Sequence, residues 1–231
     1  MFVQYHVRVN DREHRARSSP RPPGWEIVEE LLQRRVLWRA RALADPAPRV
    51  GSGIEALDRA SGGGLPRGAL TEVVVPAGGG ATIAGRAMRA AAARGDTSAL
   101  VDPGSGFDPD SAAGMGVDLS RLLWLQPPDR GALLRGTELL LETGGFGLVV
   151  LDLVGEPKRP LSRIAWARLA RRAREGGSVL LALTSAAQAR QSAALVLRVT
   201  RTRFRWRGKG RPYWDGVELQ FAPVRRAAGV S

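Results

Sequence analysis

The chain has 231 residues, enough for one medium-sized domain with extensions, and its apolar fraction of 44% is typical of a globular protein. The sequence contains no cysteine, which excludes disulfides, cysteine zinc sites, iron–sulfur clusters and thiol nucleophiles. The two histidines, His6 and His14, lie near the N-terminus, which argues against a histidine-rich metal site or a Ser–His–Asp triad. No apolar run approaches the roughly 18 residues of a membrane span, and no apolar leader follows Met1. We therefore expect a cytoplasmic protein that contacts no membrane and holds no metal.

The formal net charge is +13, and the excess is uneven. The first 50 residues hold 10 basic and 6 acidic residues, whereas the last 31 hold 8 basic and 2 acidic residues. This concentration at the C-terminal end predicts an acidic or polyanionic partner, although a net charge also serves solubility. Nearly all the cations are arginine, since Lys158 and Lys209 are the two lysines of the sequence.

The N-terminal residues are expected to lie outside the main domain. Residues 1–23 are polar and end in SSPRPP, which predicts a flexible arm. Residues 24–50 predict a helix followed by a proline-rich linker, and four apolar residues recur at helical spacing: Ile27, Leu31, Val36 and Leu37. Because exposing apolar side chains to water costs free energy, we expect these four to contact the core, a second copy or a protein partner.

Residues 51–223 predict an α/β core with a mainly parallel central sheet flanked by helices. Short apolar runs predict strands at 70–75, 98–102, 122–125, 147–152 and 179–183, with helices at 81–93, 130–143 and 161–175 between them. The runs are continuous rather than alternating, as in a parallel sheet covered on both faces. Two further strands, 195–207 and 213–221, predict a basic C-terminal hairpin, and 224–231 form a tail.

A glycine-rich loop follows the first of the core strands. A phosphate-binding loop has the pattern G-x-x-x-x-G-K-[ST], in which the lysine neutralises phosphate and the hydroxyl binds Mg²⁺. Residues 75–82 read VPAGGGAT, so Gly80 and Thr82 match the pattern while Ala81 replaces the lysine. Gly78, Gly79 and Gly80 therefore form either a vestigial nucleotide site or a simple turn from strand to helix. We expect no bound cofactor.

The order of motifs over about residues 51–200 resembles the core of the RecA recombinases. The matching pieces are GSGIEALD at 51–58, GGLPRG at 63–68, EVVVP at 72–76, FDP at 107–109, GVDL at 116–119, LLWLQP at 122–127 and LVVLD at 148–152. Asp152 then corresponds to the aspartate of the family's Walker B strand. The resemblance implies a RecA-like fold.

The departures from this resemblance remove groups that hydrolyse ATP. Gly104 stands where the family has its catalytic glutamate, and Ala186 stands where it has a glutamine that senses the nucleotide. The segments that correspond to the DNA-binding loops are short. We therefore expect no enzyme and no ATP-driven recombinase filament.

Among RecA-like proteins, a small arginine-rich chain with an N-terminal helix and a degenerate ATP loop resembles the ImuA family. That resemblance implies an accessory of SOS-induced translesion synthesis and mutagenesis. Its implied partners are ImuB, an inactive relative of the Y-family polymerases, and an error-prone polymerase, with RecA and DNA as further candidates. Two alternatives stay open: a weak DNA-dependent ATPase that uses Thr82 and Asp152, and a cell-division inhibitor resembling SulA.

Two basic surfaces are candidates for DNA or partner binding. The first is the hairpin, where arginines recur with period two and so line one face of a strand: Arg201, Arg203, Arg205 and Arg207, followed by Lys209 and Arg211. The second is the helix at 161–175, where Arg168, Arg171 and Arg172 share one face. For each surface the alternative is an ordinary solvated face.

Overall fold

The computed structural model describes residues 47–155, 160–208 and 213–226. Contacts divide the chain into Met1–Ala44 and Asp45–Ser231, and the described fold belongs to the second unit. The predicted arm at 1–23 and the predicted helix with Ile27, Leu31, Val36 and Leu37 lie outside the described residues, as do Lys209 and Arg211.

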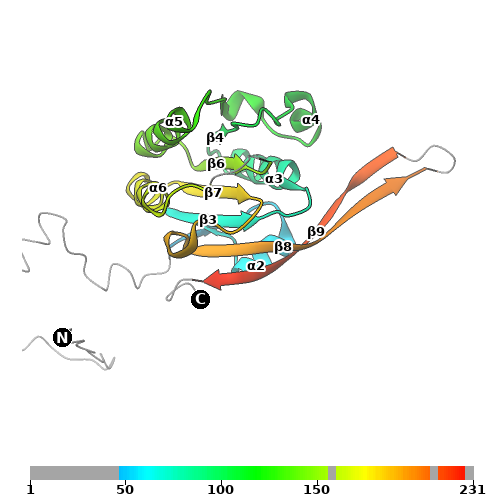
Figure 1. The fold of residues 1–231 in the computed structure, drawn as a ribbon. Helices are drawn as coiled ribbons and strands as arrows, with labels where there is room; N and C mark the ends of the chain where they lie inside the picture. Colours follow the sequence, from blue (N-terminus) through cyan, green and yellow to red (C-terminus); the bar gives the residue numbers. More distant parts are fainter. Residues whose placement is uncertain (1–46, 156–159, 209–212, 227–231) are drawn as a thin grey trace, which may run out of the picture. The chain divides into compact units, whose positions relative to one another are not determined.

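A seven-stranded sheet forms the centre of the fold, in the order β5-β4-β6-β7-β3-β8-β9 (Figure 1). The strands are β3 (Ala69–Val74), β4 (Ser98–Val101), β5 (Leu122–Leu125), β6 (Leu148–Leu153), β7 (Val179–Thr184), β8 (Leu195–Arg207) and β9 (Tyr213–Arg226). All neighbouring strands are parallel except β8 and β9. The predicted α/β class and the five predicted core strands are confirmed.

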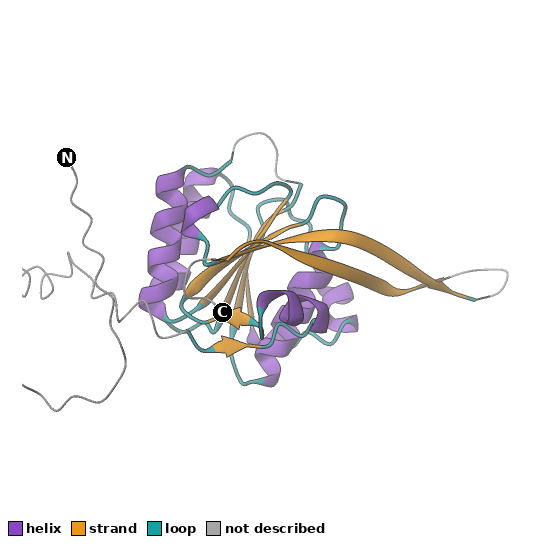
Figure 2. Ribbon diagram, turned by 90° about the horizontal axis from the view of Figure 1, so that it is seen from below, coloured by secondary structure: helices purple, strands orange, loops and turns teal. Residues whose placement is uncertain are grey.

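Helices cover both faces of the sheet (Figure 2). On one face lie α2 (Glu55–Ser61) and α3 (Gly80–Ala93), and on the other lie α5 (Arg130–Glu142) and α6 (Arg163–Gly176). Val149 and Val150 are neighbours in β6, yet they belong to opposite cores because successive side chains of a strand point to opposite faces. This arrangement explains the continuous apolar runs. None of the described helices is long and apolar enough to cross a bilayer.

Several short elements were not predicted from the sequence. They are α2, β1 (Arg49–Val50), β2 (Leu65–Pro66), α4 (Pro109–Gly114) and the 3₁₀ turns Leu119–Arg121 and Arg190–Ser192. β1 lies inside the predicted linker and pairs antiparallel with β2, so ordered structure begins before residue 51. These elements are too short for a periodic pattern. The Asp108 carboxylate, which accepts a hydrogen bond from Ser111 N–H, was a readable signal for the start of α4.

The C-terminal hairpin is longer than predicted. β9 ends at Arg226 rather than at 221, so residues 224–226, assigned to the tail, belong to the strand. The first half of β8 pairs with β3, while the distal half of the hairpin projects beyond the helices (Figures 1 and 2). The β8–β9 register shifts between Val199 and Arg201 and again between Arg205 and Trp206.

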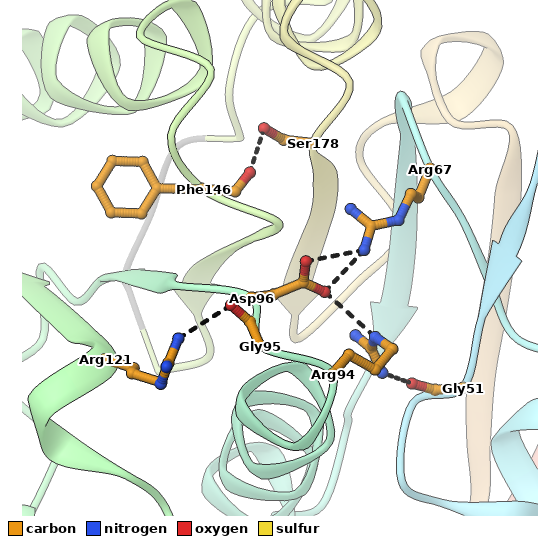
Figure 3. Close-up of polar contacts among 8 residues, drawn as sticks. All are labelled: Gly51, Arg67, Arg94, Gly95, Asp96, Arg121, Phe146 and Ser178. Atoms are coloured by element: carbon orange, nitrogen blue, oxygen red, sulfur yellow. Dashed lines mark hydrogen bonds and ion pairs between the residues drawn. The ribbon is translucent and has the colours of Figure 1, made fainter.

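Polar contacts close the amino edge of the sheet (Figure 3). The Arg67 guanidinium donates to both carboxylate oxygens of Asp96, at 2.9 and 2.7 Å, and Arg94 donates to the same group at 3.2 Å. Arg121 donates to the carbonyl of Gly95 at 2.9 Å. These contacts link the turns that precede the strands at the amino edge. The carboxyl edge is then the place where a ligand site is expected in this class of fold.

We expect Gly176→Ala to destabilise the fold, because a Cβ at this position would lie 2.0 Å from the Leu141 carbonyl oxygen, where α6 meets α5. The loss of unfolding free energy should be about 1–3 kcal/mol, as for other overpacked sites. Urea denaturation measures it. Gly145→Ala is the control, since its Cβ would meet nothing within 4 Å. Equal stability of the two variants would contradict the close approach of the helices.

Candidate functional site

The glycine-rich loop joins β3 to α3 at the carboxyl edge of the sheet. Gly78 and Gly79 have φ of +82° and +101°, a region that other residues rarely adopt. Val75 N–H donates to the Thr184 carbonyl at 2.7 Å, and Ile83 N–H donates to the Gly79 carbonyl at 3.0 Å. The predicted strand–turn–helix is therefore formed.

Two of the three loop glycines have a packing role. A Cβ on Gly79 would lie 3.0 Å from Leu219 Cδ2 of β9, and a Cβ on Gly80 would lie 3.3 Å from Val154 Cγ2. Gly78 faces open space. Close packing thus accounts for the glycines at positions 79 and 80, and no bound phosphate is needed to explain them. Sequence reasoning missed Leu219, because this residue lies 140 positions along the chain from Gly79.

The side chains near the start of α3 bring no lysine to this loop. Ala81 is exposed and Thr82 is half-buried. Lys158 and Lys209 lie outside the described residues. The next cation along α3 is Arg86, one turn beyond Thr82, and both line a hollow beside β9.

Two aspartates end neighbouring strands at the same edge. Asp102, after β4, is 4% exposed, and its carboxylate accepts hydrogen bonds from the Gly106 and Phe107 N–H groups at 3.2 and 2.9 Å. Asp152, in β6, is half-buried and accepts one from Val154 N–H at 2.9 Å. Burial raises the pKa of Asp152 above its ordinary value, and the charge of Asp102 acts in the same direction. Both carboxylates hold loops in place.

The carboxyl ends of β4, β5, β6 and β7 frame a cleft of about 510 Å³. Its walls are mostly proline and leucine, including Pro103, Pro127, Leu153 and Leu161. Gln188 also lines it, but its amide oxygen accepts a hydrogen bond from Leu161 N–H at 3.1 Å. Gly104 and Ala186 are exposed, and each follows in the chain a residue that lines this cleft. Neither has a side chain that could polarise water.

The arginines of the hairpin lie where the alternation predicts them. Arg201, Arg203 and Arg205 are exposed, and Arg205 pairs with Glu218 at 3.3 Å. No ion pair joins Arg201 or Arg203 to another described residue. The backbone of Arg207 belongs to β8, whereas its side chain is not described. Phe204 is an apolar residue of the same strand, yet it is 52% exposed, because the hairpin has left the core at this point.

Three arginines of α6, those predicted to share one face, are matched by glutamates. Arg168 pairs with Glu138 of α5 at 2.5 Å. Arg172 pairs with Glu142 and Glu175 at 3.4 and 3.2 Å, and Arg171 reaches Glu175 at 3.8 Å. Three carboxylates thus offset three guanidiniums, so this surface attracts polyanions less than its arginine count suggests.

Comparison with known proteins gives one family. Residues 42–202 match the model described as the RecA N-terminal domain. The protein RecA of Chlorobaculum tepidum is 40% identical over 107 residues, which cover 46% of this chain and 31% of that protein. The protein RecA of Nocardia farcinica is 37% identical over 111 residues, covering 47% and 32%. The chain therefore spans about a third of the length of the curated relatives it matches.

We expect Asp152→Asn to stabilise the protein at neutral pH. The folded-state pKa is raised, so the charged carboxylate costs stability as the pH rises through that pKa. The amide oxygen still accepts from Val154 N–H. Below the ordinary value of 3.8 the variant and the wild type should converge, because the carboxyl is then protonated in both states. Urea denaturation at both pH values measures the difference, with the exposed Asp110→Asn as control. A destabilised variant at pH 7 would show that the charge of Asp152 is needed.

Proposed function

The chain belongs to the family of the RecA N-terminal domain, and from this membership we propose that it is a non-catalytic RecA-like accessory protein of DNA repair. Its role is in SOS-induced translesion synthesis in the cytoplasm, as the resemblance to ImuA implies. It binds an ImuB-type polymerase relative and, through that partner, an error-prone polymerase. Contacts with RecA and with DNA belong to the same proposal.

The observation that best supports a non-catalytic role is the glycine-rich loop. It has the position of a phosphate-binding loop, but Ala81 replaces the lysine that neutralises phosphate. Leu219 and Val154 pack on its glycines. Phosphoryl transfer depends on positioned charge, so a loop without its cation is a poor catalyst.

The other strand ends agree with this interpretation. Gly104 and Ala186 supply neither a general base nor a hydrogen bond from a side chain. Asp102 and Asp152 remain, and each already accepts backbone hydrogen bonds that shape its loop. These features support the proposal that the edge that bears chemistry in this fold class serves as a scaffold in this protein.

A binding role needs surfaces, and the described residues offer two. The first is the projecting hairpin with Arg201 and Arg203. The second is the edge strand β5, where Leu123 and Trp124 are exposed although adjacent residues of a strand point to opposite faces. An edge strand with an exposed apolar side chain on each face suits contact with a protein, and one of these, Trp124, also packs against Phe107.

The protein should hydrolyse no ATP above background, with or without single-stranded DNA. Release of phosphate is the measurement, and a RecA protein assayed in parallel is the positive control. If turnover appears, is stimulated by DNA and is lost in Thr82→Ala, the weak ATPase is the correct function and the non-catalytic proposal is wrong.

Replacing Arg201, Arg203 and Arg205 together by Gln should weaken binding to single-stranded DNA. The plot of log K against log salt concentration has a negative slope, and because three phosphate contacts are lost, the magnitude of this slope should decrease by about 2. Fluorescence anisotropy across a salt series measures it. The matched control replaces Arg168, Arg171 and Arg172 by Gln, which removes the same charge from the compensated surface. An equal loss in both variants would mean that net charge, rather than the hairpin, governs binding.

The translesion role is tested in the bacterium that encodes the chain. Deleting the gene should abolish mutagenesis after DNA damage while homologous recombination continues, and the tagged protein should capture the ImuB-type protein of the same cell. Filamentous cells on overproduction, with normal mutagenesis in the deletion strain, would favour the cell-division inhibitor instead.

A further inference from the structure

A groove runs along α3 beside the base of the hairpin. It consists of two adjoining hollows of about 620 and 310 Å³, which share Thr82, Arg86 and Val217. Arg89 and Met115 line the larger one, and the smaller one lies against α2. We call the two together the α3 groove. It is separate from the proline-lined cleft at the carboxyl edge, with which it shares no residue.

The walls of the α3 groove are packed rather than loose. Met115 lies against α3, since a Cβ on Gly85 would be 2.8 Å from Met115 Cε. On the other side, a Cβ on Gly53 would be 2.7 Å from the Arg86 carbonyl oxygen. The stem of Arg89 lies along Gly116, whose Cβ would be 3.3 Å from Arg89 Cδ. The groove is therefore shaped before any partner arrives, which lowers the entropy cost of binding.

The charge of the groove is positive once its ion pairs are counted. Its two glutamates are already paired, Glu55 with Arg59 at 2.7 Å and Glu218 with Arg205 at 3.3 Å. Arg86 and Arg89 are exposed, and no ion pair joins either to another described residue. Three residues apart on one helix, they present two guanidiniums on the same face. The groove therefore offers two positive charges that pair with no described residue, above apolar residues that include Met115 and Val217.

We propose that the α3 groove binds an acidic peptide segment of a partner protein. Guanidiniums pair well with carboxylates, and Met115 and Val217 offer contact for small apolar side chains between them. A nucleic acid strand fits less well, because none of the described residues that line the groove is aromatic and they offer bases no stacking platform. The inference rests on the proposed role as a binding protein, but its test does not use the translesion partner, so the two fail separately.

The test uses the full chain and two labelled peptides of equal length, one of Glu, Ala and Leu and one with Lys in place of Glu. An oligothymidylate of similar length is the third probe. Fluorescence anisotropy at physiological salt should show binding of the acidic peptide, no binding of the basic peptide, and no loss of oligothymidylate binding in the groove variants.

The double change Arg86→Glu with Arg89→Glu should lower the affinity for the acidic peptide about tenfold or more, because each change replaces an attraction by a repulsion. Ala93→Phe, which narrows the groove without a change of charge, should weaken it severalfold. The matched control is Arg201→Glu with Arg203→Glu on the hairpin, which should alter the affinity less than about twofold. Circular dichroism and thermal unfolding verify that each variant is folded.

Three results would overturn the proposal. An equal loss of affinity in the hairpin control would mean that the peptide responds to overall charge and not to the groove. Unchanged peptide affinity in both groove variants would mean that the groove binds no acidic peptide. A loss of affinity confined to oligothymidylate would mean the same and would show that the groove binds nucleic acid.

Discussion

The buried carboxylate of Glu72 fixes the carboxyl edge of the sheet. It lies in the interior strand β3 with no exposed surface, and it accepts hydrogen bonds from Thr184 Oγ1, Gln188 N–H and Ala189 N–H at 3.0, 2.7 and 3.1 Å. A buried carboxylate that lacks its donors is strongly destabilising, so the segment after β7 has to keep these groups aimed at Glu72. That segment contains Ala186 and forms one side of the proline-lined cleft. The shape of the edge where the family does its chemistry thus depends on this contact.

The two edges of the sheet have different tasks. At the amino edge, Asp96 joins Arg67 and Arg94 and closes the turns. At the carboxyl edge, Asp102 and Asp152 hold loops through backbone hydrogen bonds. A RecA-like scaffold is therefore retained with its polar groups used for structure, which is consistent with a protein that binds rather than catalyses.

The hairpin and the glycine-rich loop are physically joined. Leu219 of β9 packs on Gly79, and Val217 lines the α3 groove with Arg86. A partner that engages the groove would contact the base of the hairpin as well, and the exposed arginines of β8 project from that base. In the proposed accessory role, peptide and DNA contacts would then lie on one connected part of the surface.

The sequence by itself determined the α/β class, the order of the core strands and helices, and the missing lysine at Ala81, because continuous apolar runs and short motifs depend on neighbouring residues. It also placed Arg201, Arg203 and Arg205 on one face, since strand alternation has a period of two. It missed α2 and α4, because helices of seven and six residues repeat the helical period too few times to form a recognisable pattern. The tertiary structure decided which distant residues are in contact. Leu219 packs against Gly79, and glutamates of α5 and α6 offset three arginines of α6. Arg86 and Arg89 line a groove together with β9. Those facts depend on contacts between segments far apart in the chain, and no local pattern encodes which segments will meet.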